Sequence, residues 1–187
     1  MDDSIDINEI KKFIYPTNLE DSVRAIYSSG RARPLYGNNS VMLKTLGNNF
    51  QGPDSYQKDY FDHFKYKKAM TEFAEFCESL KNYDNLQSRN NLIEVLLEAG
   101  DLLFQSVVLD LRHQGKTRYQ NARSQMDKAM SYVAEELIKR GLSMDLVRKL
   151  ARIKYGVRSF MIFKGLPPKN KDLEKRFCLE ELNESQK

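Results

Sequence analysis

Cysteine and long apolar runs are both scarce in this chain of 187 residues. The only two cysteines, Cys77 and Cys178, lie far apart, which predicts free thiols in a reducing compartment and argues against a disulfide scaffold. The first ten residues, MDDSIDINEI, are acidic and lack the apolar core of a secretory signal. No run approaches the roughly eighteen apolar residues of a membrane-spanning helix. We therefore expect a cytoplasmic protein without a membrane segment.

Net charge is also small, at +4, in a chain with 41% hydrophobic and 30% charged residues. This composition is typical of a soluble globular protein. Ten basic residues nevertheless gather between Arg148 and Arg176, against two acids. Such a block can attract phosphates, and it is equally typical of a solvated helix face. Its basic and aromatic residues are not interleaved in a nucleic-acid-binding motif, so nucleic acid is not the expected partner.

Glycine and proline concentrate at one end. Four of the nine glycines and three of the five prolines fall within residues 1–55, which predicts a loop-rich extension with one short helix from Asn18 to Ser29. Residues 56–187 show helical periodicity without a credible strand, so we expect one all-α domain, a bundle of four to six helices. The expected helices cover residues 56–81, 91–112, 117–140, 144–164 and 170–182.

The segment from Asn91 to Arg112, NLIEVLLEAGDLLFQSVVLDLR, carries apolar residues on every side of a helix. This predicts a core helix that is buried nearly all round, with Ser88 as its N-cap. A single polar stripe interrupts it at spacings of four, three and four, formed by Glu94, Glu98, Asp101 and Gln105. Burying an ionised carboxylate costs several kcal/mol, so a cation should neutralise the stripe. Mg²⁺ is the natural candidate, because it prefers carboxylate oxygens.

A second pair of acids stands on the preceding helix. Glu72 and Glu75 are three residues apart and therefore share one side of it. If the short connecting loop makes the two helices antiparallel, this pair faces Glu98 and Asp101, and four carboxylates converge. The plainer alternative is two helices whose acids are partly solvated and paired with Lys or Arg. Glu78, three residues further on, is expected at the surface.

Carboxylates on helices also build di-iron sites, and these require a Glu-x-x-His pattern. Neither histidine supplies it, because Tyr60 stands three residues before His63 and Asp110 three residues before His113. A di-iron centre is therefore not expected. Cys77 has no adjacent histidine or second cysteine, which argues against zinc.

The two acidic pairs also carry a family resemblance. The chain reads EFAE at residues 72–75 and, after twenty-two residues, EAGD at residues 98–101, followed directly by LLFQSVV. This resembles the MazG-type all-α nucleoside triphosphate pyrophosphohydrolases, whose signature is an ExxE followed by an ExxD. The resemblance covers about residues 60–165, and residues 1–55 have no recognised counterpart in it.

The resemblance implies a MazG-like helical bundle completed by dimerisation. It implies that Glu72, Glu75, Glu98 and Asp101 bind Mg²⁺, for which Mn²⁺ can substitute. The implied reaction is hydrolysis of a nucleoside triphosphate to the monophosphate and pyrophosphate, with a metal-activated water attacking phosphorus in line. Either Glu75 or Glu94 could accept the proton of this water, and the sequence does not choose between them.

Later in the chain the resemblance is looser. Lys154 and Arg158 approximate a family element that binds phosphate, but Gly156 stands where relatives have Asn, and Thr71 replaces an acid before the first motif. Lys154 and Arg158 could instead pair with acids at the surface. Two alternative functions follow. One is a helical binding or regulatory protein without turnover, and the other is a nucleic-acid-binding domain that uses residues 148–176.

Overall fold

A computed structural model describes residues 5–29, 67–113 and 120–185. These residues form helices and no strand, which confirms the all-α prediction. None of the described helices is long and apolar enough to cross a membrane. The seven described helices are α1 (Ile7–Ile14), α2 (Leu19–Ser28), α5 (Lys67–Asn85), α6 (Arg89–His113), α7 (Gln120–Lys139), α8 (Met144–Phe163) and α9 (Lys171–Ser185).

The chain forms two compact units. One comprises Pro34–Met144 and contains α5, α6 and α7, whereas the other joins Met1–Arg33 to Asp145–Lys187 and contains α1, α2, α8 and α9. Both ends of the sequence thus contribute to the second unit. The predicted boundary between residues 55 and 56 lies outside the described residues, so the split into an extension and one MazG-like domain stays a prediction there.

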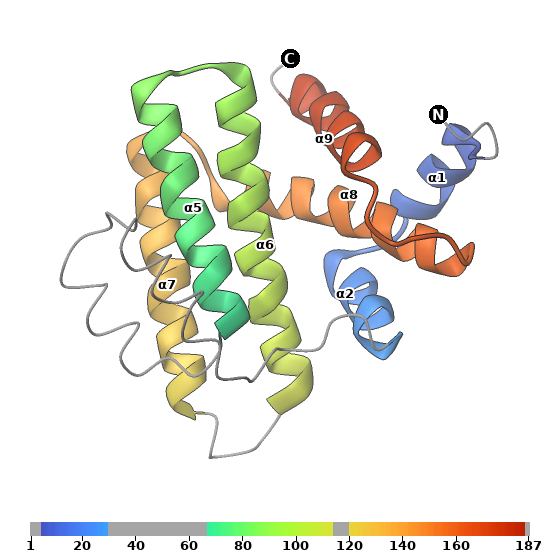
Figure 1. Cartoon of the computed structure of the whole chain (residues 1–187), viewed down its shortest axis with the longest axis horizontal. Helices are drawn as coiled ribbons and strands as arrows, with labels where there is room; N and C mark the ends of the chain where they lie inside the picture. Colours follow the sequence, from blue (N-terminus) through green and yellow to red (C-terminus); the bar gives the residue numbers. More distant parts are fainter. Residues whose placement is uncertain (1–4, 30–66, 114–119, 186–187) are drawn as a thin grey trace. The chain divides into compact units, whose positions relative to one another are not determined.

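In the first unit α5 and α6 form an antiparallel hairpin, and α7 runs beside them (Figure 1). The turn between α5 and α6 is held by polar side chains. The Ser88 hydroxyl accepts a hydrogen bond from the Asn91 backbone N–H at 3.1 Å, which confirms the predicted N-cap. The Asn91 amide donates to the backbone oxygens of Asn82 and Leu86 at 3.2 and 2.8 Å. A short, well-bonded turn fixes which residues of α5 lie opposite which residues of α6.

The predicted core helix is confirmed. Apolar side chains on all sides of α6 are buried, namely Ile93, Val95, Leu96, Leu97, Ala99, Leu102, Leu103, Phe104, Val108 and Leu109. Helix α7 contacts α5 through the rings of Tyr132 and Phe73, whose centroids are 5.6 Å apart. At its carboxyl end the Arg140 guanidinium forms a two-pronged ion pair with Asp84, next to the end of α5.

In the second unit α8 contacts α1, α2 and α9. The Phe13 ring of α1 meets the Phe160 ring of α8 edge to face, with centroids 5.5 Å apart. Arg158 of α8 pairs with Glu174 of α9, and Lys11 of α1 reaches Glu180 of α9 at 3.1 Å. Apolar packing and cross-helix ion pairs thus join α1 to α8 and α9.

Helix α1 is an element that the predicted loop-rich extension, with its one short helix from Asn18, did not include. The Asp6 side chain caps this helix by accepting a hydrogen bond from the Asn8 N–H at 2.8 Å, and Ile10 and Ile14 are fully buried. The cap and the spacing of four were both visible in the sequence, but eight residues are too few for periodicity to stand out. Packing against the rest of the unit decides this helix.

Helix ends agree closely with the sequence elsewhere. The Asn18 side chain caps α2 through the Asp21 N–H at 2.7 Å, as predicted. Gly141 and Gly165 follow α7 and α8 with φ of 71° and 70°, a left-handed conformation in which glycine is unstrained. Helix α5 continues to Asn85, past the predicted end at Lys81. The predicted start of this helix at residue 56 lies outside the described residues.

Gly156 lies where α8 packs so closely against α1 that there is little room for a side chain. A Cβ atom placed there would lie 2.9 Å from the Cγ2 atom of Ile14, so any larger residue would push α1 away from α8. We expect Gly156→Ala to lower the free energy of unfolding by about 1 to 3 kcal/mol, measured by urea titration. Ile14→Ala removes the colliding atom, so the double variant should lose less stability than the sum of the two single variants. Additive losses would contradict this contact.

Candidate metal centre

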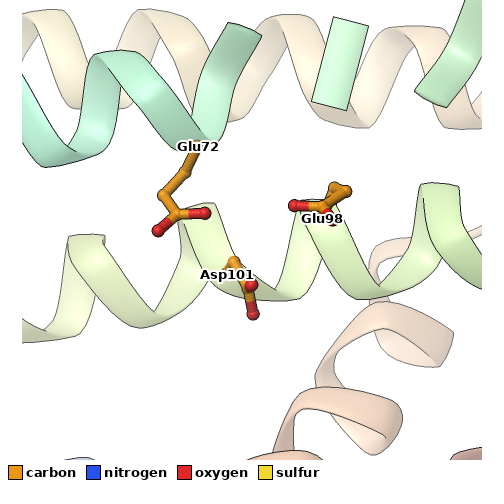
Figure 2. A group of neighbouring side chains, drawn as sticks. All are labelled: Glu72, Glu98 and Asp101. Carbon is orange, nitrogen blue, oxygen red and sulfur yellow. The ribbon is translucent and has the colours of Figure 1, made fainter. Parts of the chain in front are cut away.

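Three carboxylates meet between α5 and α6. Glu72 projects from α5 toward α6, on which Glu98 and Asp101 stand three residues apart (Figure 2). One oxygen from each of the three side chains lies within 4.8 Å of the others. The Glu72 residue is only 5% exposed, Glu98 and Asp101 are half-buried, and the Oε2 atom of Glu98 is buried. Three hard oxygen donors at this spacing could hold a metal ion.

Without a metal ion, the ionised form of Glu72 is destabilised in this cluster. Burial and the nearby charge of Asp101, with a smaller contribution from Glu75, together raise the pKa of Glu72 to about 7. Lys68 opposes this shift but does not cancel it. Glu72 is therefore only partly ionised at neutral pH, and an additional cation would favour its charged form.

Lys68 is a member of this site that sequence reasoning missed. It stands one turn before Glu72 on α5, and its ammonium forms an ion pair with Glu72 Oε1. Burial alone would lower the pKa of Lys68, but attraction to Glu72, Glu75 and Asp101 raises it. This ion pair could have been found from the sequence, because Lys68 stands four residues before Glu72 and side chains at that spacing are neighbours on a helix. Its ammonium shows that the cluster accepts a cation.

The other predicted acids are not part of this group of three. Glu75 is exposed and lies one turn after Glu72, although its charge still acts on both Glu72 and Lys68. Glu94 is half-buried one turn before Glu98, and Gln105 is buried one turn after Asp101. Glu78 is exposed, as expected. The predicted ligand role of Glu75 and the proton-acceptor roles of Glu75 and Glu94 stay predictions.

Lys154 and Arg158 belong to α8, in the other compact unit. The Arg158 Nε and Nη2 atoms donate to Glu174 at 2.7 and 2.9 Å. Arg158 thus pairs with an acid, as the alternative from the sequence had it, but Glu174 is buried rather than at the surface. Lys154 is buried, with its ammonium 5.9 Å from the Tyr155 ring centroid. The phosphate-binding role of both residues stays a prediction.

The basic block between residues 148 and 176 is partly neutralised within its own unit. Besides Arg158, three of its basic residues pair with acids. Arg148 reaches Glu20 and Arg176 reaches Glu180, at 3.5 and 3.3 Å. Lys164 pairs with Glu9. Charges that are paired in this way contribute less to an outward field, which weakens the case for a nucleic-acid surface.

Both cysteines are free thiols, as predicted. Burial, with a smaller contribution from the charge of Glu136, raises the pKa of Cys77 to about 12. A thiol that stays protonated at neutral pH is a poor nucleophile and a poor metal ligand. Cys77 therefore does not compete with the carboxylates as a chemical centre, and Cys178 is buried with its thiol donating to the Leu150 backbone oxygen at 3.5 Å. His63 and the side chain of His113 lie outside the described residues.

The donor set fits a hard divalent cation. It consists of carboxylates alone, with no described thiol or imidazole among the grouped side chains, and such sets suit Mg²⁺, Mn²⁺ or Ca²⁺. Comparison of the chain with protein-family models, curated proteins and solved structures found no match. The case for a function therefore rests on the geometry and charge of the three acids, together with the sequence motifs.

Proposed function

We propose that the protein hydrolyses a nucleoside triphosphate to the monophosphate and pyrophosphate, with Mg²⁺ held by Glu72, Glu98 and Asp101. One observation carries the proposal: three carboxylate oxygens from two helices lie within 4.8 Å of one another around a largely buried Glu72. Lys68 offsets the repulsion among these acids only in part, and a divalent cation would offset more of it. The reaction itself is inferred from the resemblance of the two acidic motifs to those of MazG-type enzymes.

When bound, Mg²⁺ would supply neutralising charge for the triphosphate and a more acidic water. The three acids would fix the cation on the rigid α5–α6 hairpin. The oxygen of a water molecule would form a bond to the α-phosphorus, and the bond from this phosphorus to the oxygen bridging to the β-phosphorus would break. Pyrophosphate would leave with the electron pair of that bond.

A carboxylate outside the group of three would accept the proton of the attacking water. Glu75 is exposed, one turn from Glu72, and Glu94 is half-buried, one turn from Glu98. Each lies beside the metal-binding acids without being one of the three grouped ligands. Glu75→Gln and Glu94→Gln separate the two, since the loss of the proton acceptor lowers kcat by about 100-fold or more and leaves metal affinity nearly unchanged.

The test is pyrophosphate release from a panel of ribo- and deoxynucleoside triphosphates, with Mg²⁺ and with EDTA. We expect release that requires the metal and is lost in Asp101→Asn. Glu78→Gln is the matched control, because Glu78 is an exposed acid on the same helix as Glu72. Metal-independent release, or equal activity of Asp101→Asn and the wild type, would overturn the proposal. Light scattering of the same samples tests the predicted homodimer.

A metal-binding or regulatory protein without turnover is the second candidate. It is favoured by the position of Glu75, which is exposed and outside the group of three rather than among the ligands as the family motif implies. The two candidates differ in one result. Tight binding of Mn²⁺ without pyrophosphate release from any nucleotide would support the second.

A further inference from the structure

Lys68 occupies an unusual position for a surface lysine. Its ammonium lies against a buried carboxylate, whereas its side chain is 39% exposed. The side chain therefore connects the acidic cluster to solvent. A lysine side chain has a flexible four-carbon stem, so the ammonium can move several ångströms without any change in the helix.

A divalent cation at this site would compete with Lys68. The ammonium is bound to Oε1 of Glu72, the same carboxylate that is one of the three grouped ligands. A cation coordinated there would take the lone pairs that hold the ammonium and would repel its positive charge. The exposed side of Lys68 gives the ammonium a route outward.

The displaced ammonium would remain one helical turn from the metal. A triphosphate coordinated to that metal brings several negatively charged oxygens into this region, and not all of them can be neutralised by one cation. A lysine ammonium is a strong partner for such an oxygen, because a charge-assisted hydrogen bond is roughly twice as strong as a neutral one. Lys68 thus has a second partner of the right charge within reach.

We propose that Lys68 exchanges partners on catalytic assembly: it balances the charge of Glu72 in the metal-free protein and binds a phosphate oxygen of the triphosphate once the metal has replaced it. This inference rests on the proposed function and adds a substrate-binding residue to it. It also differs from the sequence-based assignment of phosphate binding to Lys154 and Arg158, of which Arg158 is already held by Glu174.

The exchange makes two opposite predictions for Lys68→Met, which keeps the length of the stem and removes the charge. Without nucleotide, Mn²⁺ should bind about threefold to tenfold more tightly than in the wild type, because the competing ammonium is absent. With saturating Mn²⁺, α,β-imido deoxynucleoside triphosphates should bind about tenfold more weakly. Isothermal titration calorimetry measures both affinities. A purely structural role for Lys68 would move both in the same direction.

Three further variants make the test decisive. Lys68→Arg keeps the charge and should retain most of the nucleotide affinity. Lys68→Gln repeats the loss of charge with a polar side chain, in case Met disturbs folding, and circular dichroism checks the helix content of each variant. Lys128→Met, which removes an exposed lysine of α7, is the matched control and should change neither affinity by more than twofold.

The outcomes separate the two proposals. If the wild type binds Mn²⁺ and nucleotide but the charge-removing variants match it in both titrations, the partner exchange is wrong and the proposed function stands. If those variants lose affinity for Mn²⁺ as well as for nucleotide, the exchange is also wrong, because Lys68 would then support the metal rather than oppose it. If the wild type does not bind Mn²⁺, both proposals fail.

Discussion

Glu98→Gln and Asp101→Asn will each weaken Mn²⁺ binding by at least about 100-fold while the protein stays helical. Each substitution keeps the shape of the side chain and removes the charge that a hard cation requires. Loss of a partner that only supports a metal ligand already costs about 10- to 100-fold in affinity, so loss of a direct ligand should cost at least the upper end of this range. Calorimetric titration with Mn²⁺ and far-ultraviolet circular dichroism measure the two expectations.

The helical fold should survive these changes for an electrostatic reason. The acids of the cluster lie close together, and the charge of Asp101 contributes to the raised pKa of Glu72. Removing one negative charge relieves repulsion in the metal-free protein. Glu78→Gln provides the comparison, since it removes an exposed charge from α5 outside the cluster. Tight Mn²⁺ binding by either site variant would count against the assignment of the metal ligands.

Metal-free protein will lose stability as the pH rises from about 4.5 to about 7, and Glu72→Gln will remove this loss. The ordinary pKa of a glutamate is 4.5, and burial together with Asp101 raises the pKa of Glu72 to about 7 in the folded chain. Between these values the folded state binds more protons than the unfolded state, so unfolding becomes easier as the pH increases. A shift of this size corresponds to about 3 kcal/mol.

The measurement compares urea unfolding of the wild type and Glu72→Gln in EDTA at pH 5.5 and pH 8. The variant should gain stability relative to the wild type at pH 8, and the difference should shrink at pH 5.5. Saturating Mn²⁺ should restore the stability of the wild type at pH 8 but not that of the variant, because the cation binds the ionised carboxylate. A difference between the two proteins that is the same at both pH values would exclude Glu72 as the titrating group.

The raised pKa of Glu72 also sets the pH dependence of the affinity for the metal ion. A proton and the cation compete for Glu72, so the affinity for Mn²⁺ should fall by up to about tenfold for each pH unit below 7 and level off above it. Lys68 remains charged throughout this range, because attraction to Glu72 and its acidic neighbours raises its pKa. Lys68 therefore competes with the metal equally at every pH in this range. The slope of Mn²⁺ affinity against pH then reflects the protonation of Glu72.

Much of the site could be read before the structure was known. Glu98 and Asp101 lie three residues apart in a helix whose other faces are apolar, and that pattern places both carboxylates on one stripe of the helix. The short turn after α5 then brings Glu72 opposite them. Helix type, the N-caps at Asn18 and Ser88, and the glycine that ends α7 follow from equally local rules.

Other features depended on contacts that no spacing rule contains. The motif treats Glu72 and Glu75 alike, yet one is buried and the other exposed, because the rotation of α5 about its axis decides which of them faces α6. Lys68 became part of the site for the same reason. Gly156, which the resemblance places where relatives have Asn, lies where α8 closely approaches Ile14.

The sequence by itself determined that the described residues are helical, that α6 lies in the core, and that acids stand at matching spacings on two neighbouring helices. Only the tertiary structure decided that Glu72, Glu98 and Asp101 are the three that meet, that Lys68 balances them, and that α1 joins α8 and α9 in one unit. The physical reason is the distance along the chain over which each kind of interaction acts. Helix periodicity and capping depend on residues within about a turn of one another, whereas the meeting of side chains and the resulting pKa shifts depend on how whole helices pack.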